Sequence, residues 1–316
     1  MSIEAKKSGR KIKIDFHEKE LGIRIIPRLE FLHDLKNAID KGIAYATGRI
    51  GISEQFWMYY PIFLEKKPNK TKLRVYEKHL VYHGFFQAGI FPADPDFFLK
   101  YNTIYIQKTK DMDCLGLILD RFMGPEIIRY YNLAGKFIYF KEIVPDRSVP
   151  SNPGNCYLPF FKDKKILLIC PFANLLKQRA KKDIFEAVWA KTRRKWFYPA
   201  CVDALEFPYG FEQETHEKYP NALVLLESIT SEISRRDFDI ALIAAAGLTV
   251  PIASFVKQMK KISICPGGEI QILFGVLGKR WRNWERWKRD YFNEWWIDMP
   301  DKYKPKKKQV CEGAYW

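Results

Sequence analysis

Hydrophobic and polar positions follow different patterns in the two halves of this chain. In the second half, short runs that are apolar throughout alternate with segments of helical periodicity; the runs are 165–172, 240–247 and 262–268. Strands that are apolar along their whole length are buried on both faces, and helices are the usual connections between parallel strands. The pattern therefore predicts an α/β fold with a parallel sheet covered by helices on both faces.

The first half begins with a helix and a strand. Residues 31–42 have helical spacing and end at Gly42, a residue type that commonly terminates helices. Residues 43–50 are predicted to form a strand, and the next helix is expected to begin at Gly51 or Ser53.

Four further segments complete the secondary-structure prediction. Residues 73–131 are predicted to be mostly helical, and residues 137–144 to form a strand. Residues 195–200 are predicted to form a short strand, and residues 215–236 one long helix.

The organisation predicted from these elements is one α/β domain between two basic ends. Residues 1–30 form a basic arm, residues 31–281 the domain, and residues 282–316 a basic, tryptophan-rich tail packed on it. Within the domain we expect a helix-rich part (53–135) inserted after the first strand, a connector (145–163) and a Rossmann-like part (164–281).

Composition and charge narrow the class of protein. The 316 residues carry a formal net charge of +16, which favours nucleotides, nucleic acid or an anionic membrane surface as partners. The six cysteines contain no CxxC pair, as is typical of reduced thiols in a cytoplasmic protein. The longest apolar stretch, 240–256, is shorter than a membrane span and contains Gly247 and Pro251.

Four predicted strand ends are candidates for a ligand site. In open α/β sheets ligands bind beyond the carboxyl ends of the strands, which selects residues 48–54, 170–179, 244–251 and 265–271. None contains GxGxxG or GxxxxGK[ST], which disfavours a dinucleotide oxidoreductase and a P-loop kinase. A single turn of this kind more often only connects a strand to a helix than binds a ligand. Four of them in one sheet predict a nucleotide-sized crevice at the strand ends.

Arg49 and Glu54 have both a functional and a structural interpretation. Arg49 suits a diphosphate because its guanidinium is planar and bidentate; otherwise it is a surface residue or pairs with Glu54. Glu54 suits a general base, a metal ligand or a sugar-hydroxyl acceptor; otherwise it complements the dipole of a helix. Spacing alone favours the structural role for both.

Other polar residues leave similar alternatives. Lys279 and Arg280 either neutralise a leaving phosphate or form a basic helix end, and Gln178 reaches either a ligand or solvent. Three Asp-x-Asp pairs (94/96, 111/113 and 237/239) suit either a divalent metal that holds a diphosphate or structural roles, and we favour the structural roles. The dispersed histidines suggest no metal site. The tryptophans of 279–308 suit base stacking or a membrane interface, but we favour packing, with Trp281, Trp284 and Trp287 on one helical stripe.

Several stretches together resemble a known family. They are GRIGISE (48–54), GFFQAGIFP (84–92), 163–179, 237–257, PGGEIQILFGVLGKRW (266–281) and EGAYW (312–316). The strongest is the pattern GGxxQxxFGxxGxRW, which starts at Gly267. In these stretches the chain resembles a bacterial family of polysaccharide-related glycosyltransferases with the GT-D type fold.

The resemblance implies sugar transfer from a nucleotide-sugar donor, foremost a UDP-sugar, to a saccharide or lipid-linked saccharide during surface polysaccharide synthesis. Glu54 is then the catalytic base or sugar contact. The implied donor-binding residues are Arg49, Gly51, Phe172, Gln178, Gly247, Gly267, Gly268, Gln271, Lys279 and Arg280. The enzyme is expected to be cytoplasmic, with peripheral contact to an anionic membrane and no nucleic-acid partner.

The chain departs from the family at Ile52. Better-known members carry an aspartate at this position, associated with a divalent metal and the diphosphate, and isoleucine cannot bind a metal. Dependence on Mn²⁺ or Mg²⁺ is therefore doubtful, and basic residues are expected to stabilise the diphosphate instead. The alternatives are a nucleic-acid-binding protein that uses the tryptophan-rich tail and an inactive glycan-binding relative.

Overall fold

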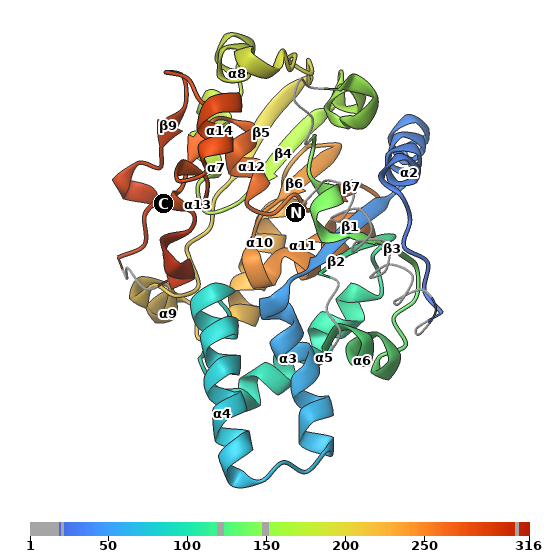
Figure 1. Cartoon of the computed structure of the whole chain (residues 1–316), viewed down its shortest axis with the longest axis vertical. Coiled ribbons are helices and arrows are strands. Elements are labelled where there is room, and N and C mark those ends of the chain that lie inside the picture. The colour runs from blue at the N-terminus through green and yellow to red at the C-terminus, as the bar shows by residue number, and fades with distance from the viewer. Residues whose placement is uncertain (1–18, 20–21, 119–122, 147–151, 307–309) are drawn as a thin grey trace.

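The central element of the fold is a seven-stranded parallel sheet (Figure 1). The computed structural model describes residues 19, 22–118, 123–146, 152–306 and 310–316. The strand order is β3-β2-β1-β7-β6-β4-β5. The strands are β1 (Tyr45–Ile50), β2 (Cys114–Leu117), β3 (Lys136–Tyr139), β4 (Lys165–Ile169), β5 (Cys201–Leu205), β6 (Ile240–Ile243) and β7 (Ile262–Ile264). The predicted α/β class with an all-parallel sheet is confirmed, and the arrangement is compatible with a Rossmann-like fold.

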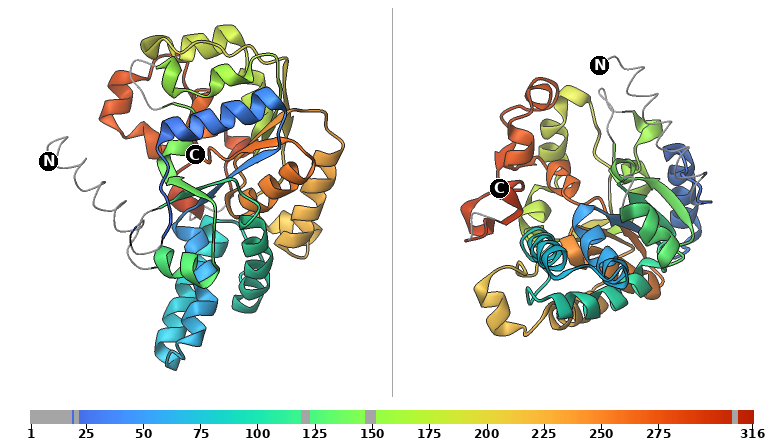
Figure 2. Two further views of the ribbon diagram at one scale, coloured as in Figure 1. Left: turned by 90° about the vertical axis from the view of Figure 1, so that its right-hand side faces the viewer. Right: turned by 60° about the horizontal axis from the view of Figure 1, so that its bottom comes forward.

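Each face of the sheet has its own hydrophobic core. Alternate residues of β4 point to opposite sides, so Leu167 and Ile169 join one core while Ile166 and Leu168 join the other. The first core includes α3 (Ile52–Glu65), α5 (Pro95–Thr109), α6 (Met123–Tyr130), α10 (Ala222–Ser234) and α11 (Thr249–Gln258). The second includes α2 (Arg28–Lys41), α7 (Ala173–Arg179), α8 (Lys182–Val188) and α12 (Glu269–Leu273). Helices thus cover both faces, and Figure 2 shows α2 lying across one of them.

The helical insertion lies between β1 and β2, whereas the predicted range 53–135 runs past β2 and includes α6. The insertion contains α3, α4 (Lys70–Val81), the π-helical segment Tyr82–Gln87 and α5. Helices α3 and α4 form a hairpin that projects away from the sheet (Figure 1). The hairpin is joined to the sheet by the first turn of α3, which starts directly after β1.

Helix α2 has the predicted end but an earlier start. Gly42 adopts a left-handed conformation (φ 62°), and its N–H caps the carbonyls of Ala38 and Ile39. The helix begins at Arg28, so the boundary expected at residue 31 falls inside it. Ile25 bridges to Phe137 of β3, which places the last residues of the predicted arm on the sheet edge; most of residues 1–21 lie outside the described part.

Four predicted elements need correction. The helical stretch 73–131 contains β2, whose four residues are too short to show a strand period. The helix predicted at 215–236 is two helices, α9 (Gln213–Lys218) and α10, because Pro220 interrupts the backbone hydrogen bonds between them. The edge strand β5 starts at Cys201, after the predicted 195–200 segment, and β3 ends at Tyr139.

The C-terminal tail folds back on the domain. It follows from α13 (Lys279–Arg282), which spans the predicted boundary, and it includes α14 (Glu285–Asp290) and β9 (Ile297–Asp298), which pairs with β8 (Val276–Leu277). Trp281 and Trp296 are buried, and the indole N–H of Trp296 donates to the carbonyl of Val188 at 3.0 Å. The expected stripe of tryptophans is wrong in part, because α13 and α14 are separate helices and Trp284 between them is exposed.

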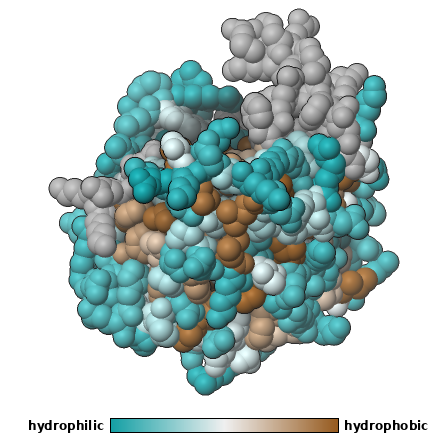
Figure 3. Space-filling view, turned by 90° about the horizontal axis from the view of Figure 1, so that it is seen from below, coloured by the Kyte–Doolittle hydropathy of each residue, from teal (hydrophilic) through white to brown (hydrophobic). Residues whose placement is uncertain are grey.

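The apolar stretch 240–256 forms β6, a short turn and the start of α11. Pro251 lies in the first turn of α11, where a proline costs no hydrogen bond. Among the described residues, every helix is too short or too polar to cross a bilayer. Seen from the end where the α3–α4 hairpin lies, hydrophobic and polar residues are interspersed (Figure 3).

Candidate functional site

A cavity of about 370 Å³ lies at the carboxyl ends of β1, β7, β6 and β4. These four strands are neighbours in the sheet, and the turn after each contributes lining residues. The chain leaves β4 toward β5 on one side and leaves β6 toward β7 on the other, a divergence that typically opens a crevice. The predicted meeting of four strand ends is therefore confirmed, and the volume suits a small-molecule ligand.

Arg49 presents a fixed positive charge to this cavity. Its guanidinium donates to the carbonyl of Pro266 and stacks on Phe140, with 3.8 Å from Cζ to the ring centroid. Its Nε is buried and has no hydrogen-bond partner among the described residues. Burial lowers the pKa of Arg49, whereas Glu269 and Tyr315 oppose that shift. The guanidinium of arginine remains charged even when burial lowers its pKa. Arg49 is therefore an immobilised cation whose Nε–H can still donate a hydrogen bond.

Glu54 caps a helix and also lines the cavity. Its Oε2 accepts a hydrogen bond from the N–H of Gly51 at 2.9 Å and so caps the first turn of α3. The same half-buried carboxyl lines the cavity. Burial raises the pKa of Glu54 to about 7, although its backbone hydrogen bonds and Arg49 act in the opposite direction. A carboxyl group with this pKa is suited to accept a proton near neutral pH.

The raised pKa of Glu54 predicts a pH-dependent stability. When the pKa of a carboxyl group is higher in the folded than in the unfolded state, its contribution to stability is complete at a pH below the unfolded-state pKa. This contribution is lost as the pH rises through the folded-state pKa. From the ordinary 4.5 to about 7, the loss is about 3 kcal/mol at 1.36 kcal/mol per pKa unit. Denaturant unfolding should therefore show that Glu54→Gln gains stability relative to the wild type between pH 5 and pH 8. A constant difference across this range would contradict the assigned pKa.

Aromatic residues form the wall of the cavity at the ends of β4 and β5. Phe172 follows β4, while Phe207, Tyr209 and Phe211 belong to the loop after β5. The rings of Tyr209 and Phe211 are stacked, with centroids 5.1 Å apart, and Trp316 meets Tyr209 edge-on. The cavity thus combines an arginine and a carboxyl group with flat apolar surfaces.

Most of the residues expected at the site lie at the cavity. Its lining includes Arg49, Gly51, Glu54, Phe172, Gly267, Gly268 and Arg280. Arg280 places its guanidinium 4.7 Å from the ring centroid of Tyr315 and donates to the Tyr315 hydroxyl at 3.3 Å. The cavity therefore has a second basic residue, more exposed than Arg49.

The structure places the other four expected residues away from the lining. Gln178 is exposed on α7, and Lys279 is exposed while its backbone N–H donates to the Trp316 carbonyl at 3.4 Å. The N–H of Gly247 donates to Ala88 at 3.0 Å, and its carbonyl accepts from Tyr101. The side-chain amide of Gln271 is buried and donates to the carbonyl of Tyr315 at 2.9 Å. The expected ligand contact is therefore corrected for all four: Gly247 and Gln271 make contacts within the protein, and the side chains of Gln178 and Lys279 are exposed outside the cavity lining.

Several lining residues were not expected. Glu269 starts α12, Phe140 follows β3, Gln87 ends the π-helical segment, Ala88 and Gly89 follow it, and Tyr315 and Trp316 come from the tail. The stretches GFFQAGIFP and EGAYW that carried the family resemblance contain most of them. Those two stretches were the available signal, since no local periodicity brings residue 315 to the end of β1.

No metal centre is assembled in the part of the chain that the structure describes. The Asp-x-Asp pairs have structural partners instead: Asp94 caps α5, Asp113 pairs with Lys257 at 2.8 Å, and Asp239 accepts from the backbone N–H of Lys165. Ile52 lies at the cavity with half of its surface exposed, and its apolar side chain offers no metal ligand.

Comparisons of this chain with protein-family models, with curated proteins and with solved structures find no match.

Proposed function

We propose that this chain is a glycosyltransferase that binds a nucleotide sugar in the cavity and transfers the sugar to a saccharide or lipid-linked saccharide acceptor. The observation that carries the proposal is that Arg49 and Glu54 line one cavity at the carboxyl ends of four adjacent strands. A glycosyltransferase site needs a cation that binds the diphosphate and a base that accepts the proton of the acceptor hydroxyl. Arg49 supplies the cation and Glu54 supplies the base.

The donor would be held by charge and by aromatic contact. The immobilised guanidinium of Arg49 and the more exposed Arg280 are suited to the diphosphate, whose negative charge grows as it leaves. The aromatic wall offers the flat surfaces on which a nucleobase stacks. A UDP-sugar is the donor we place first.

In the proposed reaction, the acceptor oxygen forms a bond to the anomeric carbon of the donor sugar. The bond from that carbon to the diphosphate oxygen breaks, and the nucleoside diphosphate leaves with the electron pair. The acceptor hydroxyl proton passes to the carboxylate of Glu54, whose pKa of about 7 allows it to accept the proton and release it again.

The surroundings of the tail favour this enzyme over the nucleic-acid-binding alternative. Trp281 and Trp296 are buried in the core, which leaves fewer rings for base stacking than the sequence suggested. The formal net charge of +16 is consistent with an anionic surface near the acceptor, and we include peripheral contact with the cytoplasmic face of a membrane in the proposal.

A nucleotide-sugar titration, with and without chelator, tests the proposal. We expect one UDP-, GDP- or CMP-linked sugar to raise the melting temperature selectively, because ligands that bind the folded state stabilise it. Transfer should persist in excess EDTA, since Ile52 and the described carboxylates assemble no metal centre. Absence of a shift with every donor would overturn the donor site; activity lost in EDTA and restored by Mn²⁺ would overturn metal independence.

A further inference from the structure

A second pocket of about 380 Å³ lies beside the donor cavity. Three chain segments run from one to the other: Phe140 to Val144, Gly268 to Leu273, and Trp281 to Trp284, each with its first residue at the donor cavity and its last at the second pocket. Glu269 lines both. The two pockets are therefore neighbours, with the first turn of α12 between them.

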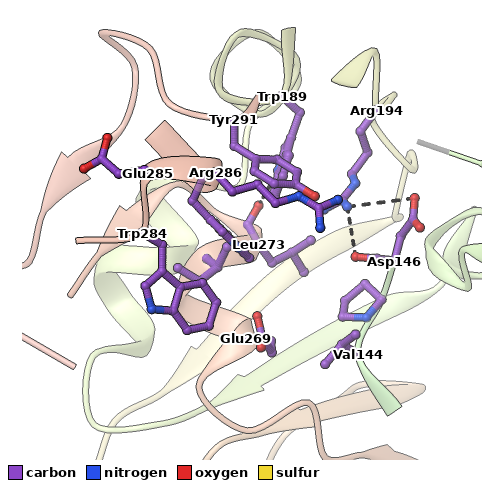
Figure 4. Close-up of a pocket in the computed structure, with 13 residues that line it drawn as sticks. Val144, Asp146, Trp189, Arg194, Glu269, Leu273, Trp284, Glu285, Arg286 and Tyr291 are labelled. Atoms are coloured by element: carbon purple, nitrogen blue, oxygen red, sulfur yellow. Dashed lines mark hydrogen bonds and ion pairs between the residues drawn. The ribbon is translucent and has the colours of Figure 1, made fainter. Parts of the chain in front are cut away.

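The second pocket has a buried polar end. Arg194 is 6% exposed, stacks on Trp189 at 3.7 Å and donates to the carbonyl of Asp146 at 3.2 Å (Figure 4). Its Nε is buried without a hydrogen-bond partner among the described residues, a position where an added oxygen acceptor lowers the free energy. The charged side chain of Arg194 therefore lines the pocket in a buried position, where loss of hydration costs free energy.

The other end of the pocket is aromatic and open. Trp284 lies there together with Glu269, as Figure 4 shows, and Trp287 and Tyr291 continue the aromatic lining from Trp284 to Trp189 at the Arg194 end. Trp284 is 45% exposed, so its indole is a flat apolar surface that no described residue fully covers. Such rings suit the apolar face of a sugar ring, while carboxylates and guanidinium groups suit its hydroxyls.

The charge of the lining indicates a neutral ligand. Arg194 and Arg286 supply two positive charges, while Asp146, Glu269 and Glu285 supply three negative charges. A phosphate or a polyanion requires a positively charged surface, whereas the positive and negative charges of this lining nearly cancel. A hydroxyl-rich neutral molecule can use donors and acceptors of both kinds.

We propose that the second pocket binds the acceptor saccharide, with Trp284 as the stacking surface for a sugar ring and Glu269 at the boundary with the donor cavity. This assignment rests on the proposed sugar transfer for its orientation, because Glu269 lines both pockets and the acceptor hydroxyl would then extend past this side chain to the donor. The saccharide-binding site itself is independent of the reaction.

The test compares Trp284→Ala with a matched control. Trp295 is also 45% exposed and also belongs to the tail, but it does not line the pocket, so Trp295→Ala controls for loss of an exposed indole. The probes are neutral disaccharides built from glucose, galactose, mannose or N-acetylglucosamine, titrated by ligand-observed NMR. We expect at least one to bind the wild type and Trp295→Ala equally and to bind Trp284→Ala about tenfold more weakly.

A parallel titration with UDP separates this inference from the donor site. The shift that UDP causes in the melting temperature should be the same in Trp284→Ala and the wild type. Disaccharide binding that needs Trp284 would support the saccharide pocket even if every nucleotide failed to bind. Failure of every nucleotide to bind would overturn only the proposed sugar transfer. No disaccharide binding to the wild type, or equal binding to Trp284→Ala, overturns the acceptor pocket.

Discussion

Replacing Glu54 by glutamine is expected to lower sugar transfer by about 10²–10⁴-fold, the usual contribution of a general base. Glutamine has nearly the same size and can still accept the hydrogen bond from the N–H of Gly51, so the cap of α3 is kept. It cannot take the proton of the acceptor hydroxyl. Nucleotide affinity should stay within a few-fold of the wild type, because Arg49 and the aromatic wall are untouched.

The measurement is kcat for transfer together with the dissociation constant of the nucleotide. Asp96→Asn is the matched control: Asp96 is also a first-turn carboxylate, on α5, and it does not line the cavity. Wild-type transfer should rise with pH through an apparent pKa near 7, and Glu54→Gln should lose this dependence. Unchanged turnover in Glu54→Gln would remove Glu54 from the chemistry and leave it as a helix cap.

The location of the cavity was predictable because it follows from the sheet alone. Strands β4, β6 and β7 are buried on both faces, so their apolar runs stand out in the sequence, and parallel strands necessarily end at one edge. The edge strand β5 and the four-residue β2 give no such signal, because one is partly exposed and the other too short. The order of the strands depends on contacts between distant segments and was not predicted.

The tail explains why part of the site was missed. Tyr315 reaches the cavity through contacts with residues far away in sequence, among them the amide of Gln271. A Cβ on Gly268 would overlap the ring of Tyr315, and one on Gly278 would lie 2.5 Å from its backbone carbon. These two glycines of the strongest motif are therefore needed to seat the tail, a role that spacing alone cannot distinguish from ligand contact.

Gly267 has a different role, because its neighbour is the guanidinium of Arg49. It adopts a left-handed conformation (φ 62°), and a Cβ there would overlap Nη1 of Arg49. Arg49 cannot move aside freely, since it donates to Pro266 and stacks on Phe140. Gly267→Ala is therefore expected to displace the guanidinium and lower kcat/KM for transfer by about 10²-fold, the effect of misplacing a charge-stabilising group by an ångström.

A double-mutant cycle with Arg49→Met isolates this mechanism. Methionine keeps an apolar contact with Phe140 but removes the charge and the overlapping atom, so Arg49→Met alone should cost about 10²–10³-fold. In that background Gly267→Ala should reduce kcat/KM little further, giving strongly non-additive effects. Gly42→Ala is the matched control for the backbone, because Gly42 has the same φ and open space around it; each alanine should cost about 1–2 kcal/mol of stability. Additive losses in the cycle would show that Gly267 acts independently of Arg49.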